Sequence, residues 1–210
     1  MKILFISLGC DKNLADSEEM LGLLTGNGHE IVDSEEEADA IVINTCCFIH
    51  DAKEESVNTI LEMAEYKKTG TCKILIVTGC MAQRYKEEIT KEIPEVDAVL
   101  GTTSYGDIVK ALNEAEAGHV FQEFKDINAL PEDSGRRVIT TGGHFGYLKI
   151  AEGCDKHCTY CIIPSLRGKF RSVPEERLLK QAEYMASQGV RELILVAQEK
   201  TVYGTDLYGK

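Results

Sequence analysis

The sequence predicts an α/β protein, with an open, mainly parallel sheet flanked by helices and then the start of a second α/β unit. Three short apolar runs rich in Val and Ile, at residues 2–8, 40–45 and 73–78, have the length and composition of buried parallel strands. Stretches of helical character separate them, and alternation of strand and helix is typical of such sheets. The alternation is lost near residue 118, so we expect a domain over 1–117, a linker over 118–143 and a second domain over 144–210.

Helices are expected between these strands. Asn13 followed by Asp16 resembles a capping box and predicts a helix that reaches about Thr25, before Gly26. The pair Asp51 and Glu54 predicts a second helix in the same way. Further elements of the first part are a helix after Cys80, a weaker strand at 98–100 and a helix at about 105–117.

The linker and the second unit follow the same logic. Pro131, Ser134 and Gly135 favour turns in the linker. A strand is expected at 147–151 and another at 192–197. Between them, Ser172, Pro174 and Glu175 predict the start of a helix that Gly189 ends.

Composition narrows the class of protein. The chain has 210 residues, eight cysteines and a net charge of −12, and it has no apolar run long enough to cross a membrane. A disulfide framework is not expected at this length, so a reducing cytoplasm fits the cysteines better. The negative charge lies in residues 1–143, which makes that part unsuited to phosphate-driven binding of nucleic acid.

Three cysteines lie close together in the run G-C-D-K-H-C-T-Y-C. Cys154, Cys158 and Cys161 have the spacing C-x3-C-x2-C. Thiolates are the ligands of iron–sulfur clusters, and three of them leave one iron of a four-iron cubane open for a small molecule. The alternatives are a zinc knuckle or unrelated buried thiols.

A second cysteine set is dispersed along the first domain. Cys10, Cys46 and Cys80 each follow a predicted strand and occupy the same position in three successive strand–helix units. Parallel strands bring such positions to one edge of the sheet, where open α/β sheets bind ligands, so we expect a metal site there. Spacing alone does not choose between Cys46 and Cys47, and three ordinary buried thiols are the alternative. Cys72 precedes its strand and is expected at the opposite edge.

These motifs resemble those of the radical S-adenosylmethionine methylthiotransferases. The resemblance is carried by S-L-G-C-D-K-N, N-T-C-C-F-I and T-G-C-M-A-Q-R in the first part and by E-G-C-D-K-H-C-T-Y-C-I-I-P-S-L-R-G in the second. It is strongest for the RimO type, which modifies an aspartate of a small-subunit ribosomal protein. It implies that residues 144–210 begin a radical S-adenosylmethionine barrel of TIM-like fold, and that Cys46 rather than Cys47 is the ligand.

The resemblance also implies the cofactors and partners. Two [4Fe–4S] clusters are expected, one on Cys154, Cys158 and Cys161, which binds S-adenosylmethionine, and one on Cys10, Cys46 and Cys80, which delivers sulfur. The expected reaction adds a methylthio group to the β-carbon of an aspartate, with electrons from a donor such as flavodoxin or ferredoxin. A tRNA adenosine methylthiotransferase is the alternative within the family, and a non-catalytic iron–sulfur or zinc protein is the alternative outside it.

Other residues near the second motif are candidates for cofactor or substrate binding. Tyr160 is where the family usually places an aromatic side chain near the adenine of the cofactor, although a core aromatic is the alternative. Arg167, Lys169 and Arg171 form a basic strip that could bind the cofactor carboxylate or an acidic substrate, or could be solvated surface. The run at 197–204 departs from the RimO pattern at Glu199 and Lys200, whose roles stay open.

The resemblance finally implies that the chain is incomplete as an enzyme. The family's barrel resembles six βα units, and about two follow residue 147. We therefore expect the 210 residues to be a fragment that does not turn over by itself.

Overall fold

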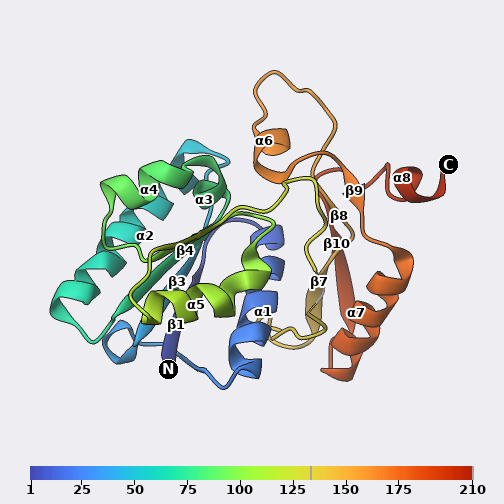
Figure 1. The fold of residues 1–210 in the computed structure, drawn as a ribbon. Coiled ribbons are helices and arrows are strands. Elements are labelled where there is room, and N and C mark those ends of the chain that lie inside the picture. The colour runs from blue at the N-terminus through green and yellow to red at the C-terminus, as the bar shows by residue number, and fades with distance from the viewer. Residues whose placement is uncertain (133, 210) are drawn as a thin grey trace.

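The computed structural model describes residues 1–132 and 134–209, which form two α/β units packed side by side (Figure 1). Asp133 of the expected linker and Lys210 lie outside the described residues. No helix in the described part is long and apolar enough to cross a membrane.

The first unit is a six-stranded sheet in which all neighbouring strands are parallel, as the sequence predicted. Its strand order is β2-β1-β3-β4-β5-β6. The strands are β1 (Lys2–Ser7), β2 (Glu30–Val32), β3 (Ala40–Thr45), β4 (Ile74–Gly79), β5 (Ala98–Leu100) and β6 (Phe121–Glu123). The chain leaves β1 toward β2 on one side and then returns to β3 on the other, so the strand order reverses between β1 and β3.

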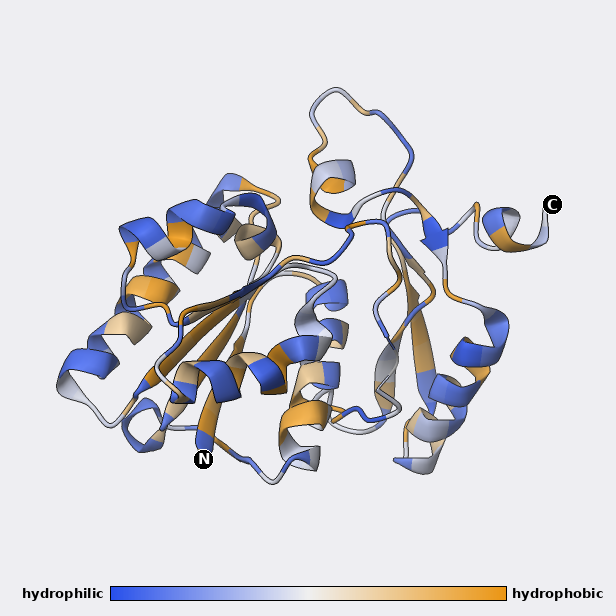
Figure 2. Ribbon diagram, viewed as in Figure 1, coloured by the Kyte–Doolittle hydropathy of each residue, from blue (hydrophilic) through white to orange (hydrophobic). Residues whose placement is uncertain are grey.

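The central strands are buried on both faces. Every residue of β3 and β4 is buried, which accounts for their continuous apolar sequence (Figure 2). Alternate residues face opposite layers: Ala40 and Val42 pack into one core cluster, and Ile41 and Ile43 pack into the other.

Helices cover the two faces of this sheet (Figure 1). One layer contains α1 (Asp11–Gly26) and α5 (Ile108–Glu116), which pack on the face of Ala40 and Val42. The other contains α2 (His50–Thr69), α3 (Cys80–Arg84) and α4 (Lys86–Glu92). Two short 3-10 helices complete the unit, η1 (Glu35–Glu37) and η2 (Tyr105–Asp107).

Several local predictions need correction. Helix α1 begins at Asp11 after Cys10, and α2 begins at His50 after Ile49, with no side-chain cap at either start. The expected capping boxes are therefore wrong, and Asn13 and Asp16 lie inside α1. The short strands β2 and β6 were not expected, and β6 carries the sheet past residue 117.

The second unit is smaller. Strands β7 (Phe145–Lys149) and β10 (Glu192–Val196) pair in parallel, and α7 (Glu175–Ser187) connects them. Between β7 and α7 lie β8 (Ala151–Glu152), the cysteine loop, α6 (Ile163–Arg167) and β9 (Arg171–Ser172), and α8 (Thr205–Tyr208) comes last. β8 and β9 pair antiparallel. The arrangement is the beginning of a βα barrel, as expected.

Candidate functional site

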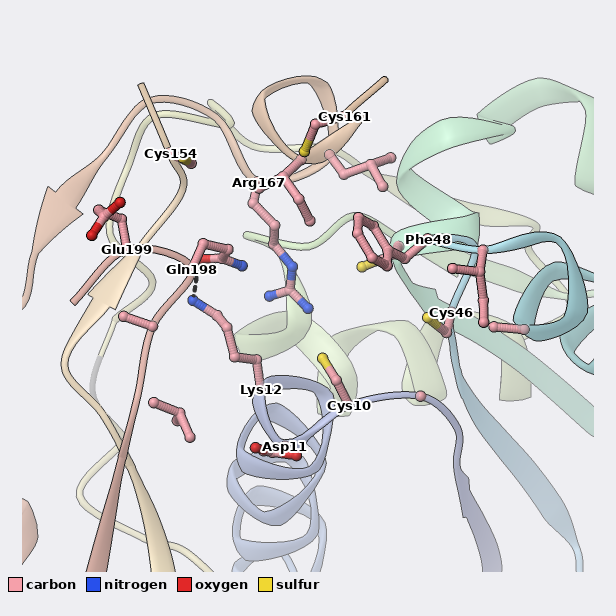
Figure 3. A pocket seen from close by; sticks show the side chains of 18 of the residues that line it. Cys10, Asp11, Lys12, Cys46, Phe48, Cys154, Cys161, Arg167, Gln198 and Glu199 are labelled. Atoms are coloured by element: carbon pink, nitrogen blue, oxygen red, sulfur yellow. Dashed lines mark hydrogen bonds between the residues drawn. The ribbon is translucent and has the colours of Figure 1, made fainter. Parts of the chain in front are cut away.

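A cavity of about 1270 Å³ lies between the carboxyl edge of the first sheet and the cysteine loop of the second unit. All six cysteines of the two predicted sets line it: Cys10, Cys46, Cys80, Cys154, Cys158 and Cys161. Figure 3 shows Cys10 and Cys46 on one side of this space and Cys154 and Cys161 on the other.

The first set reaches the cavity because of the strand order. Cys10, Cys46 and Cys80 follow β1, β3 and β4, which are adjacent in the sheet. Thr45 is in register with Gly79, so Cys46 and Cys80 leave neighbouring strands at the same level. The β1–β3 pair is also where the strand order reverses, the usual place for a ligand in an open α/β sheet.

A glycine permits the close approach of two of these cysteines. Gly9 has a φ of +93°, a conformation that L side chains rarely adopt. A Cβ atom at this position would lie 2.7 Å from the Cβ of Cys46 and 3.0 Å from its sulfur. Gly9 therefore lets the chain turn from β1 into α1 directly against Cys46.

The remaining cysteines of the first unit lie elsewhere. Cys47 packs in the core cluster on the α2 side, where burial raises the pKa of its thiol to about 11. Cys72 is buried before β4, at the opposite edge of the sheet, and its sulfur donates to the Ile74 carbonyl at 3.3 Å. The side chain that faces the cavity is thus Cys46, not its neighbour Cys47.

The second set lies on a loop closed by backbone hydrogen bonds. The amide of Cys154 donates to the Gly168 carbonyl at 3.1 Å, and the amide of Cys161 donates to the Cys158 carbonyl at 3.0 Å. The thiol of Cys158 is exposed, whereas Cys154 and Cys161 are half-buried. The three thiols are therefore accessible from the cavity.

Tyr160 and Glu199 lie at the edge of the cavity. Tyr160 is 88% exposed, so it is not a core aromatic, and its expected contact with a cofactor stays a prediction. Glu199 pairs with Lys156 of the cysteine loop. That hydrogen bond, with others from Thr201, lowers the pKa of Glu199 to about 2.

In the expected basic strip Lys169 is exposed, but Arg167 and Arg171 are turned into the protein. Arg167 is 2% exposed, and its guanidinium donates to Asp16 Oδ2 at 2.7 Å and to Asn13 Oδ1 at 2.5 Å. Arg171 is half-buried and donates to the backbone carbonyls of Arg167 and Lys169. Both guanidinium groups are thus used within the chain rather than offered to a substrate.

Arg167 belongs to a buried network of charges that the sequence analysis missed. Lys149 pairs with Asp16, and it lies 2.8 Å from Glu152. The Lys12 ammonium donates to the Ala151 carbonyl at 2.7 Å and to Gln198 Oε1 at 2.6 Å, and it forms an ion pair with Glu152 at 3.1 Å. The network joins α1 to β7, β8 and α6, so it lies across the boundary between the two units.

Burial and opposite charge act against each other in this network. Burial lowers the pKa of Lys12 to about 8, although Glu152 opposes the shift. Burial alone would raise the pKa of Glu152, but Lys12, Lys149 and Arg167 hold it well below its usual range. Burial also raises the pKa of the Cys80 thiol, and this shift is partly offset by the charge and hydrogen bond of Arg167.

The sequence pattern that could have indicated this network lies on one face of α1. Asn13, Asp16 and Glu19 repeat at three-residue spacing, which places them on one side of the helix. Polar residues so arranged usually face solvent, yet all three are buried here.

The thiols that line the cavity are the donor atoms that iron–sulfur clusters use. Within residues 1–132 and 134–209, no three His, Cys, Asp or Glu side chains converge tightly enough to hold one metal ion. The thiolates of a cubane each bind a different iron and are spread more widely than the ligands of one ion. Two groups of three thiols on one large cavity are suited to that arrangement.

Comparison with protein families places the chain in a class. Residues 2–101 match a family described as Uncharacterized protein family UPF0004, and residues 148–208 match the Radical SAM superfamily. With the cysteine loop and the incomplete barrel, these matches define a radical S-adenosylmethionine protein. Together with the relatives below, these matches make the chain similar to the radical S-adenosylmethionine methylthiotransferases, for which S-adenosylmethionine and iron–sulfur chemistry are expected.

Within that family, the chain is similar along its whole length to proteins named ribosomal protein uS12 methylthiotransferase RimO. It is 66% identical over 210 residues to the protein from Lachnoclostridium phytofermentans, 51% over 210 to that from Clostridioides difficile and 51% over 216 to that from Acetivibrio thermocellus. Each comparison covers 100% of this chain but only 48%, 47% and 48% of the relative. The chain thus spans about half the length of the curated relatives it matches.

Proposed function

We propose that this chain forms the cluster-binding half of a methylthiotransferase that adds a methylthio group to the β-carbon of an aspartate in ribosomal protein uS12. The observation that carries the proposal is that both sets of three cysteines, which lie on two different units, line one cavity. The names of the relatives supply the substrate, and their similarity extends over the whole chain.

The six thiolates would hold two [4Fe–4S] clusters. Cys154, Cys158 and Cys161 would bind the cluster that takes S-adenosylmethionine on its open iron, and Cys10, Cys46 and Cys80 would bind the second. When bound, these groups supply the radical, the sulfur and the methyl group, with electrons from a donor such as flavodoxin or ferredoxin.

The residues of the chain would orient the reactants and keep water out. Tyr160 stands at the cavity edge, where its ring can stack on the adenine of the cofactor. Phe48 and Ile49 are 52% and 57% exposed on the opposite edge and offer an apolar surface to a substrate. Lys12 connects α1 to the second unit through its contacts with Ala151, Gln198 and Glu152.

A protein substrate fits the charge of the chain better than tRNA. The net charge is −12, and acidic residues of the first unit line the cavity at Asp11, Asp51 and Glu55. Nucleic-acid binders gain most of their affinity from basic side chains that neutralise phosphates. A phosphate backbone would therefore be repelled from this side of the cavity.

Iron and sulfide analysis of the chain after anaerobic reconstitution tests the clusters. Replacement of Cys154, Cys158 and Cys161 by Ala is expected to remove about half of the iron, because one of two equal clusters is lost. Cys47→Ala is the matched control and is expected to keep all of it. Unchanged iron in the triple variant would contradict the assignment.

The proposed substrate is tested with a longer protein. A chimera can join this chain to the remaining half of the Lachnoclostridium phytofermentans relative, with uS12 and tRNA offered together. Mass analysis is expected to find the methylthio group on the uS12 aspartate. Modification of tRNA alone would reverse the choice of substrate.

A further inference from the structure

We propose that Arg167 is a positioning residue that holds the first cysteine set in a fixed place relative to the second. The inference rests on the proposed function in treating the two sets as the ligands of two clusters. Figure 3 shows the Arg167 side chain extending into the space between Cys161 and Cys10.

Asn13 connects Arg167 to the first set. The amide nitrogen of Asn13 donates to the Leu8 carbonyl at 3.0 Å and to the Thr45 carbonyl at 2.9 Å, on the segments that lead into Cys10 and Cys46. Its amide oxygen lies 3.8 Å from the Cys80 sulfur, within the range of a hydrogen bond to sulfur. One side chain thus contacts the segments or atoms that place all three cysteines.

Arg167, which belongs to the second unit, donates hydrogen bonds to Asn13 and to its neighbour on the helix, Asp16. One nitrogen of its guanidinium donates to the same Asn13 oxygen at 2.5 Å, and another donates to Asp16 at 2.7 Å, a few residues after Cys10 on α1.

The same residue is anchored to both ends of the second cysteine loop. Arg167 is the last residue of α6, the helix that follows Cys161. Its neighbour Gly168 accepts the hydrogen bond from the Cys154 amide, and its own guanidinium lies 3.6 Å from Glu152, just before Cys154. Movement of the loop would therefore move the guanidinium, and with it the Asn13 side chain that contacts the first cysteine set.

The guanidinium is chemically suited to this task. Arg stays charged, and its planar fork presents several donors in a fixed geometry, so it can hold Asn13 and Asp16 at once. A Lys at this position would carry its charge on a single ammonium at the end of a flexible side chain, and it could not hold Asn13 and Asp16 in fixed positions at the same time. With 2% of its surface exposed, Arg167 does not exchange these partners for water.

Cross-linking of the metal-free, reduced chain tests the inference without any cluster. Cys10 and Cys158 are exposed and belong to different sets, so bis-maleimides of graded length can join them, with the pair identified by peptide mass spectrometry. In the unmodified chain we expect one spacer length to dominate. Arg167→Met is expected to lower the yield at that length by about tenfold or more, since charge-assisted hydrogen bonds are lost, and to spread it over other lengths.

A matched control separates positioning from general support of the interface. Arg137 is also buried at the boundary, where it pairs with Glu18 at 2.6 Å, and it does not line the cavity. Arg137→Met is expected to lower the melting temperature while keeping the spacer profile. Equal changes in the two profiles, or an unchanged profile in Arg167→Met, would overturn the proposal.

Two further variants keep the test decisive if Arg167→Met does not fold. Arg167→Lys retains the charge, and Arg167→Met with Asp16→Asn removes one charge of each sign. Both variants are expected to fold and to form cross-links over a broader range of spacer lengths. If both instead show the spacer profile of the unmodified chain, the positioning role of Arg167 is refuted. Failure of the proposed function would instead show as a lack of iron, with the spacer profiles unaffected.

Discussion

Replacement of Asp16 by Asn tests whether the buried charges hold the two units together. The side chain of Asp16 is 5% exposed, and it pairs with Lys149 and Arg167, which are 8% and 2% exposed. Removal of one partner from a buried pair usually costs about 3–5 kcal/mol, because the remaining charge stays out of water. Glu152 remains 2.8 Å from Lys149 and 3.6 Å from Arg167, so we expect the lower end of that range, about 3 kcal/mol.

Urea denaturation followed by circular dichroism measures this loss, and an exposed pair provides the control. Lys2 and Glu37 lie 2.9 Å apart with side chains 45% and 60% exposed, so Glu37→Gln is expected to change the free energy of unfolding very little. Hydrogen exchange should localise the effect of Asp16→Asn to α1 and β7, on the two sides of the boundary. A loss no larger than that of Glu37→Gln would refute the idea that these charges stabilise the interface.

Two further predictions concern single residues. Burial raises the pKa of Glu19, so its contribution to the free energy of unfolding falls as pH rises above the ordinary carboxyl value. Glu19→Gln should therefore be the more stable protein at pH 7–8, with a melting-temperature gain that shrinks toward pH 4; a gain independent of pH would contradict this. Gly9→Ala should cost about 1–3 kcal/mol in urea denaturation, because of its positive φ and the contact with Cys46. Gly106→Ala, which meets nothing within 4 Å, should cost much less, and equal losses would show that the Gly9 turn is not strained by a side chain.

The sequence by itself determined the sheet and the position of the cysteines. Continuous apolar runs predicted β1, β3 and β4, and β3 and β4 are buried at every position, as a strand covered on both faces is expected to be. Parallel strands share one carboxyl edge, so the common position of Cys10, Cys46 and Cys80 after their strands already predicted that they lie along the same edge, where all three line the cavity. The short strands β2 and β6 escaped prediction, since three residues carry too little pattern.

Only the tertiary structure decided what the polar residues do. Local sequence favours a helix cap for Asn13 and Asp16, and for Arg167 it favours a basic strip that binds a ligand or lies in solvent. In the structure Arg167 contacts both of them, although it lies 154 residues after Asn13 and 151 residues after Asp16 in the chain. A pattern of apolar residues reports which face of an element is buried, but the pairing of buried charges depends on which elements the fold brings together.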